Sequence, residues 1–192
     1  MRNIVKLSVT LFLICAIACG VLGFTNAMTE PIILVQEAEA AQLARAEVMP
    51  AADDISEKVD DATLAKINEV CDGKVEEAYI AKSGDSVCGY TFQIKENGFG
   101  GSVTVMVGID SDGNVTGMRV TKHSETAGLG ATATTNEHFI HQYEGHNAAE
   151  NLKVVKDGGD IDSLTGATIT SRAVTRAVNY ACQAFLTVKE AN

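Results

Sequence analysis

The sequence contains no tryptophan, only 2 prolines, and aromatic side chains at 5% of its 192 positions. Basic residues are also scarce, because 15 lysines and arginines stand against 25 aspartates and glutamates and leave a net charge of −10 at pH 7. An acidic chain of this kind repels nucleic-acid phosphates and anionic lipid headgroups, so we expect no nucleic acid as a partner. With 17 glycines, the composition is typical of a loop-rich soluble module.

Five cysteines are present, and none has the C-x-x-C spacing of a metal or redox site. Cys15 and Cys19 lie in an apolar stretch, where they are expected to pack against a neighbouring helix. Cys71 and Cys88 are the better candidates for a disulfide, whereas Cys182 is expected to be a buried thiol. A free structural cysteine remains the default for these three. The sequence also shows no separate set of nucleophile, base and oxyanion donors, so no catalytic residue is predicted.

Residues 7–29 form an uncharged stretch that is long enough to cross a bilayer as a helix. Arg2 and Lys6 precede it, which predicts a cytoplasmic N-terminus over residues 1–6 and places the remaining chain on the outer side of the cell membrane. A cleaved signal peptide and a lipoprotein signal at Cys19 are the alternatives. Both are less favoured, because the apolar stretch exceeds a usual signal core and stays apolar after Cys19.

Residues 30–70 are expected to form a helical stalk or linker, and residues 71–192 the main domain. Val35 to Val48 is rich in helix formers and is ended by Pro50. Asp53 to Val70 is interpreted as a second helix, with plausible core positions at Ile55, Val59, Leu64 and Ile67. About 160 residues follow the anchor, the size of one domain with a real core.

Short β-like runs then alternate with glycine and aspartate. They cover Ala78 to Lys82, Ser86 to Ile94, Val103 to Ile109 and Val115 to Thr121. Ser111-Asp112-Gly113-Asn114 predicts a hairpin turn between the last two. A final helix is predicted from Ser171 to Lys189, where apolar residues recur at helical spacing. The order of elements predicts an α+β domain with a mixed or antiparallel sheet and a C-terminal helix.

Three histidines, His138, His141 and His146, lie close together, the first two at i and i+3 of a probable helix. Glu137 and Glu144 are adjacent. No cluster of acidic residues or cysteines completes a ligand set at convincing spacing, so we expect exposed histidines and no metal site.

The segment Asp162-Ser163-Leu164-Thr165-Gly166-Ala167-Thr168 is the most informative part of the chain. It is small and polar, and more hydroxyls follow where the last helical pattern begins. A phosphate attached to such a loop would lie at a helix N-terminus, where free N–H groups and the helix dipole favour an anion. A hydroxyl-rich helix cap explains the same residues. Spacing alone leaves both interpretations open.

This segment resembles the flavinylation motif Asp-x-x-(Ser/Thr)-Gly-Ala-Thr of the bacterial FMN-binding domain family. In that family a flavin transferase takes FMN from FAD and esterifies its phosphate to the last threonine. The resemblance therefore implies covalent FMN on Thr168, with Asp162, Thr165, Gly166 and Ala167 as the frame that the transferase recognises.

Two further segments carry the resemblance. His123-Ser124-Glu125-Thr126-Ala127-Gly128-Leu129-Gly130 is similar to a His-x-Glu-Thr-Pro-Gly-Leu-Gly loop in family members such as the G component of Rnf complexes and the C component of the sodium-pumping NADH:quinone reductase. Ala127 replaces the proline, which relaxes the backbone. Gly98-Phe99-Gly100-Gly101 is similar to the family's turn into a strand. The loop's place in the family implies flavin-binding roles for His123, Glu125, Thr126, Gly128 and Leu129.

The function implied by the resemblance is electron relay by a membrane-anchored flavoprotein. The implied partners are the membrane, a flavin transferase, and the other membrane subunits of an ion-translocating ferredoxin:NAD oxidoreductase (Rnf) complex. The alternatives are a stand-alone surface flavoprotein that exports electrons, the C component of the quinone reductase, and an anchored binding domain without flavin in which Thr168 only caps a helix.

Overall fold

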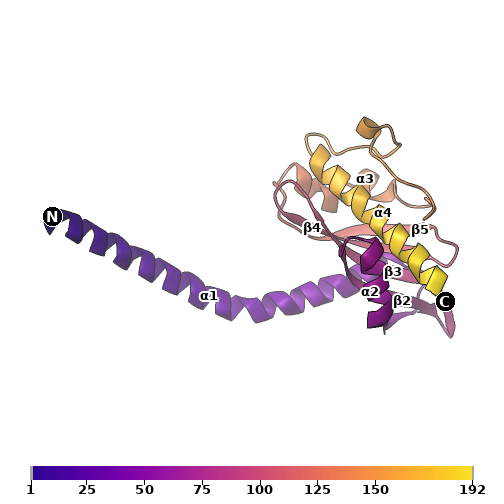
Figure 1. The fold of residues 1–192 in the computed structure, drawn as a ribbon, viewed down its shortest axis with the longest axis horizontal. Helices are drawn as coiled ribbons and strands as arrows, with labels where there is room; N and C mark the ends of the chain where they lie inside the picture. The colour runs from indigo at the N-terminus through magenta and orange to yellow at the C-terminus, as the bar shows by residue number, and fades with distance from the viewer. Residues whose placement is uncertain (1, 192) are drawn as a thin grey trace. The chain divides into compact units, whose positions relative to one another are not determined.

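The computed structural model describes residues 2–191, and the chain divides into two compact units, one up to Ala40 and one from Ala41. Helix α1 (Arg2–Val48) makes up the first unit and continues into the second (Figure 1). Among the described residues it is the one helix long and apolar enough to cross a membrane. The expected anchor and the expected helix from Val35 to Val48 are thus one continuous helix, with Pro31 inside it. It ends before Pro50, as predicted.

The hydroxyls within α1 are satisfied by the helix itself. Thr10, Thr25 and Thr29 donate to the carbonyls of Lys6, Val21 and Thr25 at 2.9, 2.9 and 3.0 Å. Each bond runs to the residue four positions earlier, so the polar side chain needs no partner outside its own helix. These threonines are therefore compatible with an apolar surrounding.

The second unit is built on a five-stranded antiparallel sheet in which each strand pairs with the next along the chain. The strands are β1 (Asp54–Lys58), β2 (Val75–Ser83), β3 (Ser86–Asn97), β4 (Ser102–Asp110) and β5 (Val115–His123). The predicted hairpin turn between β4 and β5 is confirmed. Gly113 adopts a φ of 92°, and the Asp110 carboxylate accepts from the N–H groups of Asp112 and Asn114 at 2.9 and 2.8 Å.

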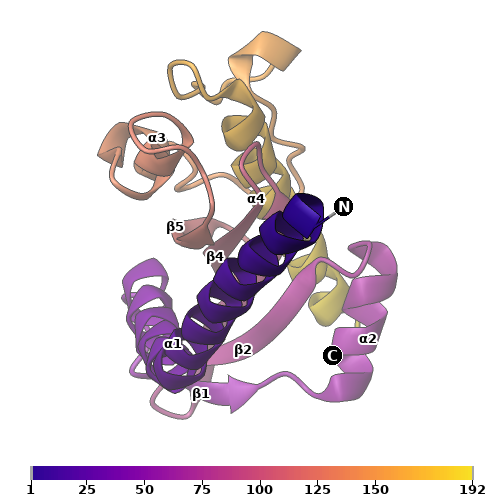
Figure 2. The same ribbon diagram turned by 90° about the vertical axis from the view of Figure 1, so that its left-hand side faces the viewer.

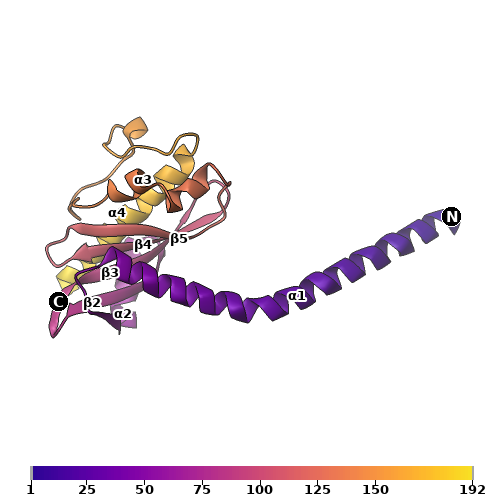
Figure 3. The ribbon, with the colours of Figure 1, turned by 180° about the vertical axis from the view of Figure 1, so that it is seen from behind.

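Strand β4, which lies between β3 and β5, is buried on both faces. On one face, Val103, Val105 and Val107 pack into the main core beneath helix α4 (Thr168–Ala191). On the other, Met106 packs against Val48 at the end of α1. Figure 3 shows this end of α1 in front of the sheet, with α4 behind it. Since side chains alternate along a strand, one run of residues contacts two helices.

Gly108 of β4 allows the closest approach of α1. A Cβ atom there would lie 2.3 Å from the Val48 carbonyl oxygen, so only glycine fits without displacing the helix end. The hydroxyl of Thr116 on β5 donates to the same carbonyl at 2.5 Å. The last turn of α1 is thus fixed to the sheet, and its carbonyl is satisfied from outside the helix.

The helix expected from Asp53 to Val70 is wrong in its first half. Residues Asp54–Lys58 form the edge strand β1, and helix α2 spans only Asp61–Val70. The Asp60 side chain accepts from the Thr63 N–H at 2.9 Å and caps the start of α2. Lys58 donates to Glu77 of β2 at 2.7 Å. Helix α2 lies beside α4 (Figure 2).

The predicted α+β class is confirmed, with an antiparallel sheet and a C-terminal helix. The segment between β5 and α4 carries only short helices, η1 (Gly130–Thr134), α3 (Glu137–His141) and η2 (Val155–Asp157). The cysteines are free, including the candidate pair Cys71 and Cys88, and Cys182 is the buried thiol expected. Helix α4 begins three residues before the predicted start at Ser171.

Candidate functional site

Thr168 is the first residue of α4 and stays partly exposed. A tight turn precedes it, in which the Ala167 N–H donates to the Leu164 carbonyl at 3.0 Å and Gly166 adopts a φ of 74°. Ser171, one turn into the helix, accepts from the Leu164 N–H at 2.9 Å. The turn is therefore hydrogen-bonded to the first turn of α4, and the Thr168 hydroxyl lies where the turn meets the helix.

Thr168 does not act as a cap of α4. Among residues 2–191, the bond of its Oγ1 comes from the Lys156 ammonium at 2.8 Å, and no backbone N–H of α4 donates to it. Ser171, by contrast, directs its hydroxyl to the backbone and donates to the Ala167 carbonyl at 3.0 Å. The hydroxyl of Thr168 is thus left available to chemistry outside the helix.

Glu125 joins three segments that lie far apart in the sequence. Its Oε1 accepts from the N–H groups of Phe99 and Gly100 at 2.7 and 3.2 Å, and its Oε2 accepts from the Thr170 hydroxyl at 2.9 Å. The side chain is buried, with 9% of its surface exposed. The β3–β4 turn, the loop after β5 and the start of α4 are therefore held together by one carboxylate.

Glycines make the room that this carboxylate needs. A Cβ on Gly98 would lie 2.0 Å from Oε1 of Glu125, and a Cβ on Gly130 would lie 2.5 Å from its Oε2. Both positions are inside motifs that the sequence had singled out. Their glycines are explained by close approach to Glu125.

A pocket of about 340 Å³ opens beside Thr168, between these three segments. It is lined by Phe99, Glu125, Thr126, Leu129, Gly130, Gly166, Ala167, Thr168, Ile169 and Thr170. Three large apolar side chains at its edge remain open to solvent, with exposed fractions of 71% for Phe99, 44% for Leu129 and 47% for Ile169. Its size is in the range of small-molecule sites. An apolar pocket next to a reachable hydroxyl fits a planar aromatic group tethered at that hydroxyl.

Asp162 is held by its backbone and presents its carboxylate outward. Its N–H donates to Gln142 Oε1 at 2.7 Å, and its carbonyl accepts from Gln142 Nε2 at 3.1 Å. The carboxylate lies 3.3 Å from Nε2 of His138, and both side chains are largely exposed. A protein that recognises this turn from outside can therefore reach Asp162.

His141 and His146 each contact the carboxylate of a nearby glutamate. His141 lies 2.6 Å from Glu144, and this hydrogen bond raises the pKa of His141 above its usual range. His146 lies 2.7 Å from Glu150, and that hydrogen bond lowers the pKa of the carboxyl. Within the part of the chain that the structure describes, no three His, Cys, Asp or Glu residues are arranged to hold a metal.

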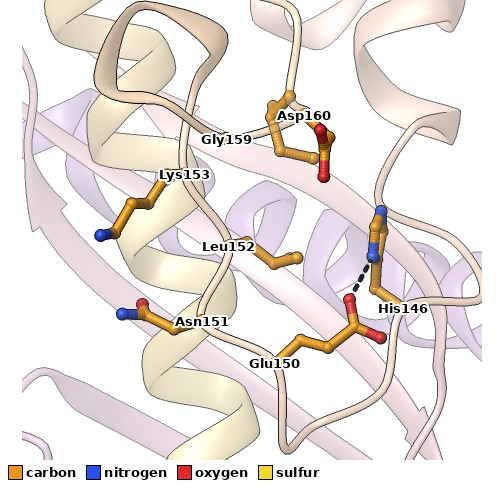
Figure 4. Close-up of a pocket in the computed structure, with 8 residues that line it drawn as sticks. His146, Glu150, Asn151, Leu152, Lys153, Gly159 and Asp160 are labelled. Atoms are coloured by element: carbon orange, nitrogen blue, oxygen red, sulfur yellow. Dashed lines mark hydrogen bonds and ion pairs between the residues drawn. The ribbon is translucent and has the colours of Figure 1, made fainter.

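A second pocket, of about 270 Å³, lies by the pair of His146 and Glu150 (Figure 4). Asp160 and Lys153 also line it, with the Lys153 side chain directed away from His146. The lining of this second pocket mixes polar and apolar atoms, and its reactive side chains do not point toward one common place. The pocket beside Thr168 is therefore the better candidate.

The structure brings together most of the site residues that the sequence indicated. Glu125, Thr126, Leu129, Gly166, Ala167 and Thr168 line the pocket. His123, Gly128, Asp162 and Thr165 are not among its lining residues. His123 instead accepts from the Glu125 N–H at 3.2 Å. Gly128 adopts a φ of 76° and shapes the loop.

Five residues of the site were not assigned from the sequence, namely Phe99, Gly130, Ile169, Thr170 and Lys156. Phe99 was noted within its glycine-rich turn, and an aromatic side chain between glycines was a usable signal. Ile169 lies two residues before the predicted start of the last helix and outside its apolar repeat, so it gave no signal. Lys156 gave no signal, because it reaches Thr168 from an irregular loop 12 positions earlier.

Comparison with known proteins places these features in a family. A family model described as the FMN-binding domain matches residues 98–183, and one described as the RnfG N-terminal region matches residues 1–48. A curated relative from Acetobacterium woodii, named as the G component of the Na(+)-translocating ferredoxin:NAD(+) oxidoreductase complex, is 38% identical over 96% of this chain and 92% of its own length. A relative from Methanosarcina acetivorans, named as the G component of an ion-translocating oxidoreductase complex, is 34% identical over 94% and 93%.

Solved structures show the same fold. The C component of the Na(+)-translocating NADH-quinone reductase from Parabacteroides distasonis superimposes with a TM-score of 0.51 at 21% identity, covering 67% of each chain. NqrC from Shewanella oneidensis gives a TM-score of 0.50 at 20% identity, covering 76% of this chain and 74% of that one.

Proposed function

The chain belongs to the RnfG family, the G components of Rnf complexes with an FMN-binding domain, and from this membership we propose that it carries FMN covalently, through a phosphoester to Thr168. The observation that carries the proposal is the position of one hydroxyl. Thr168 Oγ1 lies at the edge of an apolar pocket built by all three motifs, and it makes no capping bond within α4.

The residues of the pocket have separate tasks in this proposal. Thr168 forms the ester and keeps the cofactor from diffusing away. Phe99, Leu129 and Ile169 provide apolar contact for the flavin ring system and exclude water from one side of it. Glu125 holds the walls together and does not itself need to touch the ring, because both of its oxygens are already bonded. When bound, FMN supplies one- and two-electron transfer, and the protein supplies position and environment.

The protein is membrane-anchored through α1, and we place the N-terminus in the cytoplasm and the FMN domain on the outer side. Arg2 and Lys6 lie before the apolar stretch, which favours this orientation. The implied partners are the other membrane subunits of the complex and the transferase that attaches the flavin. The match of residues 1–48 to the RnfG N-terminal region supports a place in the complex over a stand-alone surface flavoprotein.

In-gel fluorescence tests the attachment. The natural protein, Thr168→Ala and Ser163→Ala are each co-expressed with a flavin transferase, denatured and viewed under ultraviolet light. We expect fluorescent bands for the natural protein and for Ser163→Ala, whose hydroxyl stands at a position that the motif leaves open, and a dark band for Thr168→Ala. A dark natural band beside an active transferase would refute the proposal, as would a fluorescent Thr168→Ala band.

A further inference from the structure

Lys156 occupies an unusual position for a lysine in an acidic chain. Its ammonium donates to the neutral hydroxyl of Thr168 at 2.8 Å. Over residues 2–191, no carboxylate lies within ion-pair distance of Lys156, although the next residue is an aspartate. That residue, Asp157, is engaged by Arg172 in a bidentate pair at 2.6 and 2.7 Å. The cation is therefore directed at the modified hydroxyl and not at a nearby acid.

The loop that carries Lys156 is fixed at both sides. At its base, Val154 and Ile161 are buried and form a bridge, with the Val155 N–H donating to the Ile161 carbonyl at 2.8 Å. At its tip, the pair of Asp157 and Arg172 ties η2 to the first turns of α4, which begins with Thr168. Lys156 thus has a defined backbone position relative to the hydroxyl, even though its side chain is exposed.

We propose that Lys156 supplies the positive charge for the flavin phosphate at Thr168, both while the phosphoester forms and after it has formed. This inference rests on the proposed function, because it names the residue that serves the same site. A lysine ammonium has three donors and binds phosphate as a point charge. In a chain of net charge −10, it offsets the repulsion that an incoming dinucleotide meets at this site.

The chemical step balances without a further reactant. Thr168 Oγ1 forms a bond to the phosphorus that bears the riboflavin part of FAD, and the pyrophosphate bond breaks. AMP leaves with the bridging oxygen, and the hydroxyl proton passes to a base of the transferase or to water. Lys156 takes no proton, because an ammonium has no free lone pair. Its bond occupies a lone pair of Oγ1 and leaves the hydroxyl proton free to depart.

The Lys156 ammonium stays favourable at this site after the phosphodiester has formed. The new phosphodiester carries one negative charge on oxygens that are bonded to the phosphorus next to Oγ1. The ammonium that bonded Oγ1 can pair with those oxygens without rearrangement of the loop. Lys156 is therefore expected to act on the rate of attachment as well as on the restraint of the attached phosphate.

The rate of flavin attachment tests the proposal. Purified full-length protein in detergent is incubated with transferase and FAD, and the flavin-bearing fraction is followed by intact mass. We expect Lys156→Met, which removes the charge and keeps an unbranched side chain, to be labelled roughly 1.5- to 5-fold more slowly, the range for one exposed charge pair. Lys156→Arg should restore most of the rate. Lys153→Met, in the same segment but without a bond to Thr168, should match the natural protein.

Ionic strength separates a charge effect from a structural one. Near 1 M salt the screening length is about 3 Å, so the natural protein and Lys156→Met should converge in rate. Equal rates for Lys156→Met and the natural protein at low salt would overturn the proposal. A slow rate that persists at high salt and is not restored by arginine would also overturn it. If the natural protein itself is not labelled, the proposed function fails before this question arises.

A double-mutant cycle tests whether the ion pair of Asp157 and Arg172 holds Lys156 in position. Arg172→Lys keeps the charge but loses the bidentate geometry with Asp157. It should slow labelling in the natural background and cause no further loss in the Lys156→Met background. Losses that add in the double variant would overturn the assignment of this ion pair as the support of Lys156.

Discussion

Glu125 offers the strongest quantitative test of how the pocket is built. Replacing it with alanine removes the acceptor of two backbone N–H groups and one hydroxyl, all in a buried setting. Each hydrogen bond to a charged group contributes about 1.5–3 kcal/mol, and such terms are not additive, so we expect a loss of about 3–5 kcal/mol in the free energy of unfolding. Glutamine keeps the shape and one carbonyl oxygen, and its amide can donate to the Thr170 hydroxyl. We expect Glu125→Gln to lose only about 1 kcal/mol.

Thermal unfolding followed by circular dichroism measures these differences. At about 2–4 °C per kcal/mol, Tm should fall by roughly 10 °C for Glu125→Ala and by roughly 3 °C for Glu125→Gln. Glu69→Ala, an exposed carboxylate on α2, serves as the control and should stay within about 0.5 kcal/mol of the natural protein. Equal Tm values for Glu125→Ala and the natural protein would show that Glu125 does not hold the three segments together.

Two further predictions concern groups outside the pocket. Burial raises the pKa of Cys71 to about 11 and that of Cys182 to about 12. A maleimide at about pH 7.5 should therefore label Cys88 but neither buried thiol in the folded domain, and peptide mapping that finds rapid labelling of Cys71 or Cys182 would refute this packing. The hydrogen bond with Glu144 raises the pKa of His141, so the contribution of His141 to stability is full below about pH 6.5 and is lost as pH rises through the raised value. NMR titration should show this pKa falling toward the reference in Glu144→Gln, and an unchanged pKa would contradict the contact.

Strands β2 to β5 and the last helix were predictable because their signals are local. The β4–β5 turn follows from an aspartate and a glycine at the positions that a tight turn demands, and the structure confirms it. The family resemblance carried by the three motifs is confirmed by the family models. These features depend on residues close together in the sequence.

The errors arose where distant pairing decides the structure. Ile55 and Val59 have helical spacing, yet Asp54–Lys58 pairs with β2 as an edge strand. The N-cap at Asp60 was the local signal that the helix starts later. The tie through Glu125 and the contact of Lys156 with Thr168 join segments from different parts of the chain, so no periodic pattern could indicate them.

Peptide mass mapping of the protein purified from its own membranes tests the central claim most directly. Trypsin cleavage after Lys156 and Arg172 releases residues 157–172, which contain Thr168 together with other hydroxyls at Ser163, Thr165, Thr170 and Ser171. Fragmentation of this peptide is predicted to locate a single FMN phosphoryl group on Thr168. An unmodified peptide in a flavin-competent cell, or FMN on another hydroxyl, would contradict the account.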